Sequence, residues 1–222
     1  MSTSKTSLTS ILGKEWYVPL ILLIPFLVSW SVWDLLPEQV PIHFNIQGEA
    51  DDWGPRWINA FLMPLIGLGL YFFLLIVPTI DPKNQIENKQ EALRIIRIAT
   101  SLFMVVVYGV VMGQSLGYDW NITQIIFAAT GLLFLLLGQA MKSVKPNYFM
   151  GIRTPWTLEN EHVWNRTHAW SGTLWVWGGV AMMASSFIPN ESFMLGFFLA
   201  IIAVLVLGPL IFSFLEHRKV SE

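Results

Sequence analysis

The sequence predicts an all-helical membrane protein that crosses the bilayer six times, with the N-terminus and the C-terminus both in the cytoplasm. Two observations indicate a membrane protein: 54% of the 222 residues are hydrophobic and 13% are charged. Soluble domains carry about 25% charged residues, so most of this surface does not face water. A third observation, the placement of Lys and Arg along the chain, predicts the orientation.

Six uncharged stretches are long enough, or nearly so, to cross a membrane as helices. Spanning the hydrocarbon takes roughly 20 apolar residues, and a helix satisfies its own backbone in lipid. The first stretch is interpreted as a signal anchor, because no small-x-small cleavage site follows it. The predicted spans are residues 16–33, 57–80, 98–118, 120–141, 169–190 and 192–215.

The basic residues gather on one side of such a chain. Alternating spans place only Arg56 on the opposite side. Because basic loops stay in the cytoplasm, the tails 1–15 and 216–222 are predicted to be cytoplasmic. The residues on the basic side are Lys5, Lys14, Lys83, Lys89, Arg94, Arg97, Lys142, Lys145, Arg153, Arg166, Arg218 and Lys219.

The first part of the chain is predicted to be a loosely ordered tail over 1–15, followed by a helical hairpin over 16–80. Its outer loop, 37–56, alternates apolar and polar residues from 40 to 46, which predicts a short strand. Pro41 would confine that strand to a sheet edge. Gly48 then permits a turn, and residues 51–55 are typical of a second turn.

The middle of the chain is predicted to be an inner helix over 81–97, followed by a transmembrane hairpin over 98–141. Asp81-Pro82 is a helix start signal, and the helix should run on into the third span. A stripe of glycines at four-residue spacing then favours close helix packing within the chain over a dimer interface, leaving the oligomeric state open. These glycines are Gly109, Gly113 and Gly117.

The C-terminal part, 142–215, begins with a distinctive inner segment over 145–168 and continues into two spans. Asn147 and Gly151 permit turns. Thr154 followed by Pro155, or alternatively Thr157, is typical of a helix N-cap.

The helix that follows this cap is expected to run on into the fifth span. It would place Glu161, Asn165 and His168 on one face, where a packed polar seam beside Arg153 is the favoured interpretation. Arg153 could bind a carboxylate, a helix C-terminus or a lipid phosphate.

The inner segment resembles the SdpI family of bacterial membrane immunity proteins. The pattern is Asn-x-x-x-Gly-Ile-Arg-Thr-Pro-x-Thr over 147–157, followed by Glu161, Trp164 and His168. The outer loop resembles the DUF1648 domain found upstream in that family, with Arg56 standing where a lysine is expected. Its matching residues are Leu36, Pro37, Pro41, His43, Phe44, Asn45, Gly48, Asp51, Trp53 and Gly54.

The resemblance covers residues 17–215 and implies a non-enzymatic protein of the bacterial plasma membrane, without a cofactor. It implies resistance to a secreted, membrane-active peptide toxin, and capture of a cytoplasmic repressor at the inner face. The two motifs are the residues expected to contact these partners.

Other functions remain open from the residues themselves. His43 lies near Asn45, Glu49, Asp51 and Asp52, but the spacing matches no metal motif, so a turn or a toxin-contact loop is favoured. A metal or proton-relay role for the face of Glu161, Asn165 and His168 is likewise less favoured than a polar seam. The chain has no cysteine, which excludes disulfides and Cys-type metal sites, and it lacks the HExxH spacing.

A small transporter or efflux protein is the main alternative, and a membrane-embedded hydrolase using His43 or His168 is a third. The spans lack central ionisable residues, which counts against proton-coupled transport, although Gln114 and Gln139 could line a path. A net charge of −2 gives no reason to expect nucleic acid as a partner.

Overall fold

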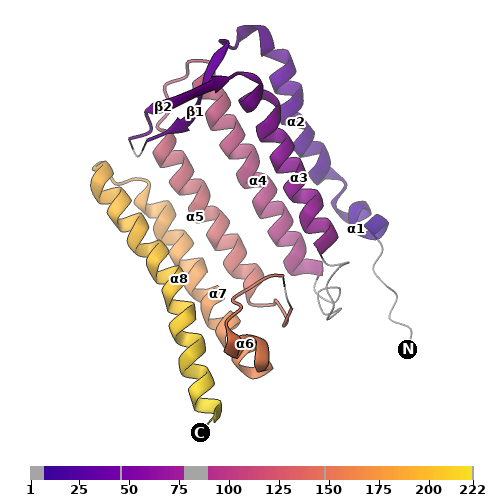
Figure 1. Cartoon of the computed structure of the whole chain (residues 1–222), viewed down its shortest axis with the longest axis vertical. Coiled ribbons are helices and arrows are strands. Elements are labelled where there is room, and N and C mark those ends of the chain that lie inside the picture. Colours follow the sequence, from indigo (N-terminus) through magenta and orange to yellow (C-terminus); the bar gives the residue numbers. More distant parts are fainter. Residues whose placement is uncertain (1–7, 46, 78–89, 148, 222) are drawn as a thin grey trace.

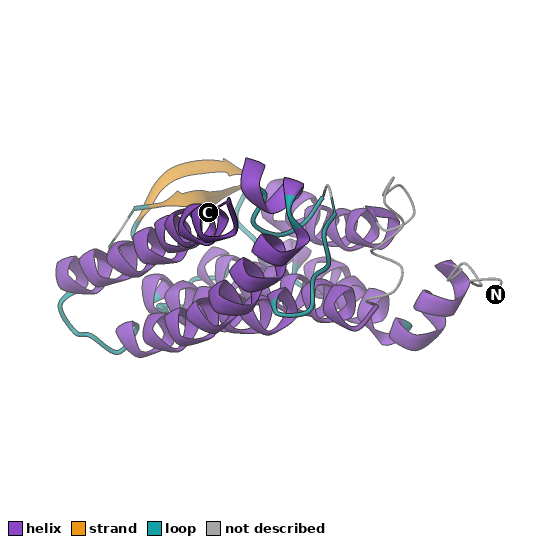
Figure 2. Ribbon diagram, turned by 90° about the horizontal axis from the view of Figure 1, so that it is seen from below, coloured by secondary structure: helices purple, strands orange, loops and turns teal. Residues whose placement is uncertain are grey.

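The computed structural model describes residues 8–45, 47–77, 90–147 and 149–221. Six long helices lie side by side, with both termini at one end of the bundle and a two-stranded sheet at the other (Figure 1). Seen from the end that carries the termini, the strands lie at the rim of the bundle (Figure 2). The long helices are α2 (Tyr17–Ser31), α3 (Met63–Ile76), α4 (Gln90–Ser115), α5 (Ile122–Met141), α7 (Glu161–Ser185) and α8 (Glu191–Ser221).

Four helical segments are long and apolar enough to cross a membrane, and they coincide with predicted spans two, three, four and six. They are Ile58–Ile76, Glu91–Ser115, Ile122–Met141 and Ser192–Val220. The helix of predicted span one, α2, is apolar but has 15 residues. The helix of span five, α7, has 25 residues, but its first half is polar. Among the described residues, four of the predicted spans are therefore confirmed as helices long and apolar enough to cross a membrane, whereas crossing by α2 and α7 stays a prediction.

The N-terminal tail differs from the expectation, because α1 (Leu8–Glu15) is a helix rather than a loose segment. Leu12 packs against the buried cluster of Val18, Leu22 and Tyr71. This contact orders the helix against α2 and α3. Residues 1–7 lie outside the described part of the chain.

The outer loop holds a second strand that the sequence analysis missed, so the helical bundle carries a two-stranded sheet. Strand β1 (Gln39–Phe44) pairs antiparallel with β2 (Ala50–Pro55). The strand predicted near 40–46 is confirmed over 40–44, but the turn predicted at 51–55 is wrong. Val40 is fully buried opposite Gly54, and a single strand there would leave backbone groups unpaired. Pairing with residues 50–55 satisfies these backbone groups, and Pro55 is tolerated because it ends the strand.

The inner segments follow the predictions in part. Residues 90–97 are the first turns of α4 and run unbroken into the third span, as expected, whereas 81–89 lie outside the described residues. Thr154 caps α6 (Pro155–Glu159), as expected. The helix does not continue into span five, however. It stops at Asn160, whose side chain accepts hydrogen bonds from the N–H groups of His162 and Val163 and so caps α7 anew.

Two glycine pairs bring α5 and α7 into backbone contact. A Cβ added to Gly131 would lie 2.6 Å from the carbonyl oxygen of Gly179, and one added to Gly138 would lie 2.7 Å from that of Gly172. Both glycines of each helix are seven residues apart, so they share a face. Small residues give this close approach in lipid, where packing drives association. The predicted glycine stripe at 109–117 does not do this; Trp120 covers Gly113 instead.

Replacing Gly138 by valine should therefore push α5 and α7 apart. We expect a loss of about 1–3 kcal/mol of stability from overpacking, measured as the thermal unfolding midpoint in mild detergent. Gly69 is a matched control, because a Cβ added there meets nothing within 4 Å. Equal midpoints for Gly138→Val and Gly69→Val would refute the tight contact.

Candidate functional site

The tip of the outer hairpin is closed by its own hydrogen bonds. The Asn45 N–H donates to the carbonyl oxygen of Glu49, and the Glu49 N–H donates to Oδ1 of Asn45 at 2.9 Å. Asn45 Nδ2 donates to Glu49 Oε2 at 3.1 Å. Gly48 has φ +77°, a left-handed conformation that favours glycine. Asn45 and Gly48 of the predicted outer motif thus shape the turn.

His43 and Asp51 pair across the two strands, with Nδ1 and Oδ1 2.5 Å apart. Their side chains are 67% and 44% exposed, so solvent screens this pair and its contribution to stability is small. Among the described residues, no group of three or more His, Asp or Glu side chains could hold a metal ion. The pair is therefore an exposed feature of the hairpin.

Two residues anchor the hairpin to the bundle. Buried Asn59 donates from Nδ2 to the Pro41 carbonyl oxygen at 2.8 Å and to Ser115 Oγ at 3.1 Å. Arg56 Nη1 donates to the carbonyl oxygens of Trp33 and Leu36 at 3.0 and 3.1 Å, and its guanidinium lies 4.2 Å from the centre of a Trp33 ring. Arg56, which stands where the sequence analysis expected a lysine, thus holds the hairpin to the bundle. Asn59 was missed, because a single Asn inside an apolar span carries no pattern.

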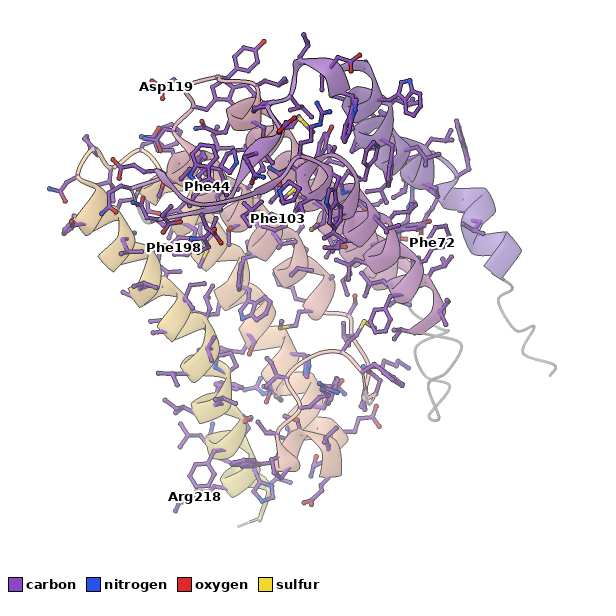
Figure 3. All side chains as sticks on the ribbon, turned by 45° about the horizontal axis from the view of Figure 1, so that its top comes forward. Phe44, Phe72, Phe103, Asp119, Phe198 and Arg218 are labelled. Carbon is purple, nitrogen blue, oxygen red and sulfur yellow. The ribbon has the colours of Figure 1, made fainter. Side chains whose placement is uncertain are left out.

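A polar cavity of about 530 Å³ lies between the hairpin and the turn that joins α4 to α5. Glu49 of the hairpin and Asp119 of the turn contribute carboxylates to its wall, with Gln114 and Asn121 beside them. Figure 3 shows Asp119 at the same end of the bundle as Phe44 of the hairpin, with Arg218 at the far end. The volume is in the range of small-ligand sites. We call this feature the outer cavity.

The inner motif is held together by its own side chains. Asn147 accepts on Oδ1 from the N–H groups of Phe149 and Met150 and donates from Nδ2 to the carbonyl oxygens of Lys145 and Met150. Thr157 Oγ1 accepts from the Thr154 N–H and donates to the Ile152 carbonyl oxygen at 2.8 Å. The polar side-chain groups of Asn147 and Thr157 are therefore engaged in hydrogen bonds that shape the loop.

His168 closes the same loop from α7. Its ring stacks on Trp164 at 4.0 Å between centroids, and Trp164 Nε1 donates to the Val144 carbonyl oxygen. Nδ1 lies 2.8 Å from the Trp164 carbonyl oxygen, and the Ile152 N–H donates to Nε2 at 2.9 Å. A carbonyl only accepts, so the proton sits on Nδ1 and the neutral ring satisfies both partners. Burial lowers the pKa of His168 from 6.5 to about 4.

Gly151 makes room for this histidine. It has φ +97°, and an added Cβ would collide with His168 Nε2. Asn147, Gly151, Thr157 and His168 of the inner motif therefore form an interlocking structural set.

The polar seam expected beside Arg153 does not form. Glu161 and Asn165 are exposed, whereas His168 is buried with Trp164 and Thr167. Helix α7 buries a different face from the one expected. The residues that face inward are 163, 164, 167, 168 and 171. Arg153 and Pro155 are also exposed, so this part of the inner motif is a surface.

A buried ion pair at the inner end was missed altogether. Arg97 donates from Nε and Nη2 to the two carboxylate oxygens of Glu15 at 2.8 and 2.6 Å. The side chains are 0% and 2% exposed. Arg94 Nη2 donates to the Tyr17 hydroxyl beside it. In the sequence analysis, Arg97 appeared only as one of the basic residues that predict the orientation.

The comparisons with known proteins agree with the motifs. Residues 143–213 match the model of the SdpI/YfhL protein family, and residues 20–68 match a domain of unknown function, DUF1648. A relative named immunity protein SdpI, from Bacillus subtilis (strain 168), is 28% identical over 205 residues, covering 91% of this chain and 95% of the relative. No solved structure matches. The resemblance predicted from the sequence is confirmed, and the protein is a multi-pass membrane protein of the bacterial cell.

Proposed function

Since the chain carries an SdpI/YfhL family region together with a DUF1648 region, we propose that it is a non-enzymatic immunity protein that protects its cell from a secreted, membrane-active peptide. The observation that carries the proposal is similarity along nearly the whole chain to an immunity protein. The geometry supports it, because polar side chains of the inner motif are used to shape a loop.

We propose six crossings with both termini in the cytoplasm. Residues 169–185 of α7 belong to predicted span five and extend about 25 Å at 1.5 Å per residue, close to the roughly 30 Å of hydrocarbon. The 15 residues of α2 cover less, but α1 and the 3₁₀ turn Trp33–Leu35 flank it on either side. The hairpin would then face outward, since Arg56 is the only Lys or Arg assigned to that side.

The absence of cysteine makes this topology testable with single cysteines and an impermeant maleimide. We expect Asp52→Cys and Pro189→Cys to label in intact cells. Lys14→Cys and Lys145→Cys should label only after permeabilisation. All four positions are exposed in the structure. Labelling of Lys14→Cys from outside would show that α2 does not cross, and labelling of Lys145→Cys would refute the inner placement of the motif.

We assign toxin contact to the outer hairpin and the outer cavity, and contact with a cytoplasmic repressor to the exposed part of the inner motif. On the outside, His43 and Asp51 are exposed beside the acidic wall of Glu49. On the inside, Glu161 and Asn165 are exposed. Buried His168 and Thr157 would support these contacts through the loop rather than touch a partner.

The decisive experiment is survival of a toxin-sensitive bacterium that lacks its own immunity protein, expresses this chain and is challenged with the sporulation-delaying peptide toxin. We expect protection by the wild-type chain and by Gly69→Phe, a lipid-facing control. Vesicles from the same cells, tested for energy-dependent accumulation of a hydrophobic dye, distinguish the transporter alternative. No protection, with the protein shown to be in the membrane, would refute the proposal for that toxin.

A further inference from the structure

A second cavity adjoins the outer cavity. It is an apolar groove of about 570 Å³ on the side of the bundle, between α4 and α5. Its wall includes Val106 and Val110 of α4 and Ile125 of α5. Asp119, Trp120 and Asn121 line both the groove and the outer cavity, so the two meet at the turn that joins α4 to α5. We call this second feature the lateral groove.

The glycine stripe of α4 explains why the groove is hollow. A Cβ added to Gly109 would meet nothing within 4 Å, and Gly109 lines the groove. Gly113, one turn on, is covered by the Trp120 ring, and Gly117 has φ +88°, which turns the chain toward Trp120. Gly109 thus leaves the floor of the groove open, and the Trp120 ring over Gly113 forms one aromatic wall. The stripe does not make a helix–helix contact there.

The two cavities differ in chemistry. The lateral groove is walled mainly by apolar side chains, whereas Glu49 and Asp119 give the outer cavity two carboxylates. Among the residues that the structure describes, no Lys or Arg lines either cavity. Arg56, the basic residue of this side, is occupied with the carbonyl oxygens of Trp33 and Leu36.

We propose that the joined cavities bind one amphipathic, cationic segment of a peptide that arrives through the outer leaflet. Its apolar side chains occupy the lateral groove, and a Lys or Arg beside them reaches Glu49 and Asp119. This rests on the proposed function and names the chemistry that the site recognises. Carboxylates without a basic neighbour attract a cation and repel a phosphate, so an anionic phospholipid headgroup fits the site poorly.

The test uses the full chain in phosphatidylcholine nanodiscs and a fluorescein-labelled peptide of alternating Leu and Lys clusters as the probe. Gly109→Phe fills the groove, and Asp119→Lys reverses one charge in an exposed turn. The matched control is Gly69→Phe, which adds the same side chain to open space on α3. Anisotropy should show about tenfold weaker binding for both site variants, equivalent to about 1.4 kcal/mol, and no change for the control.

A charge swap keeps the proposal falsifiable if Gly109→Phe fails to fold. The same peptide with Glu in place of Lys should bind Asp119→Lys more tightly than it binds the wild-type chain. Equal binding of both peptides by the wild-type chain and Asp119→Lys would overturn the proposal. So would loss of co-purified phosphatidylethanolamine in Gly109→Phe with peptide binding unchanged, which would make the groove a lipid site.

Survival distinguishes the two proposals from each other. If the wild-type chain protects and Gly109→Phe loses protection at equal membrane level, both stand. If both chains protect equally, immunity stands and this site is refuted. If the wild-type chain binds the Lys peptide through Asp119 but gives no protection, the site stands and the immunity function fails.

Discussion

Replacing Arg97 by alanine is expected to destabilise the protein by about 3–5 kcal/mol, because it leaves the Glu15 carboxylate buried without its partner. The pair is fully enclosed and held by two hydrogen bonds. Replacing Glu15 by alanine should cost a similar amount. Arg97 Nη1 has no hydrogen-bond partner among the described residues, and Nε and Nη2 both donate to Glu15.

The measurement is the thermal unfolding midpoint in mild detergent, read from tryptophan fluorescence. Lys14→Ala is the matched control, since Lys14 precedes Glu15 but is exposed, and its effect should stay within about 0.5 kcal/mol. The double variant Glu15→Leu with Arg97→Met should recover most of the loss, because apolar residues of similar volume replace buried ion pairs well. A double variant as unstable as the single ones would contradict this account.

Acidification is expected to remove roughly 3 kcal/mol of stability through His168 alone between pH 6.5 and pH 4. The folded-state pKa is lowered to about 4 by burial, whereas the unfolded side chain titrates near 6.5. Between pH 6.5 and pH 4, His168 therefore binds a proton in the unfolded chain but not in the folded chain. The stability is fully present above pH 6.5 and falls until the folded pKa is reached. Protonation at Nε2 would also break the hydrogen bond from the Ile152 N–H.

Carboxylates contribute to acid unfolding as well, so the informative quantity is the difference between variants. His168→Asn should be less stable at pH 7.5 but should lose much less between pH 6.5 and pH 4 than the wild-type chain. His162→Gln, at an exposed position six residues earlier in α7, should keep the wild-type slope. Identical slopes for the wild-type chain and His168→Asn would mean that His168 is not the responsible group.

Several features follow from the sequence by itself. Long apolar runs specify helices in lipid because backbone groups have no other partner there. Four of the predicted spans are helices long and apolar enough to cross a membrane. Local capping was also predictable: Thr154 and Asn121 accept hydrogen bonds from N–H groups within three residues, so nothing distant is needed. The paired outer and inner motifs were sufficient to indicate the similarity to the SdpI/YfhL family and to DUF1648.

Other features depend on contacts between distant residues, which no local pattern encodes. Glu15 and Arg97 lie 82 residues apart in sequence, and Asn59 reaches Ser115 across 56. Strand β2 was missed because Asp51, Asp52 and Gly54 favour turns locally, whereas pairing with a buried β1 satisfies more backbone groups. The face that α7 buries was likewise decided by the tight approach to α5 at Gly131 and Gly138.

The sequence therefore determined that this is a membrane-embedded helical bundle with a patterned loop at each end. The tertiary structure decided how those loops are used. Asn147, Thr157 and His168 became internal braces because their hydrogen-bond partners lie within the folded loop. Glu49 and Asp119, which lie 70 positions apart, became two walls of one cavity only when the hairpin folded over the turn between α4 and α5.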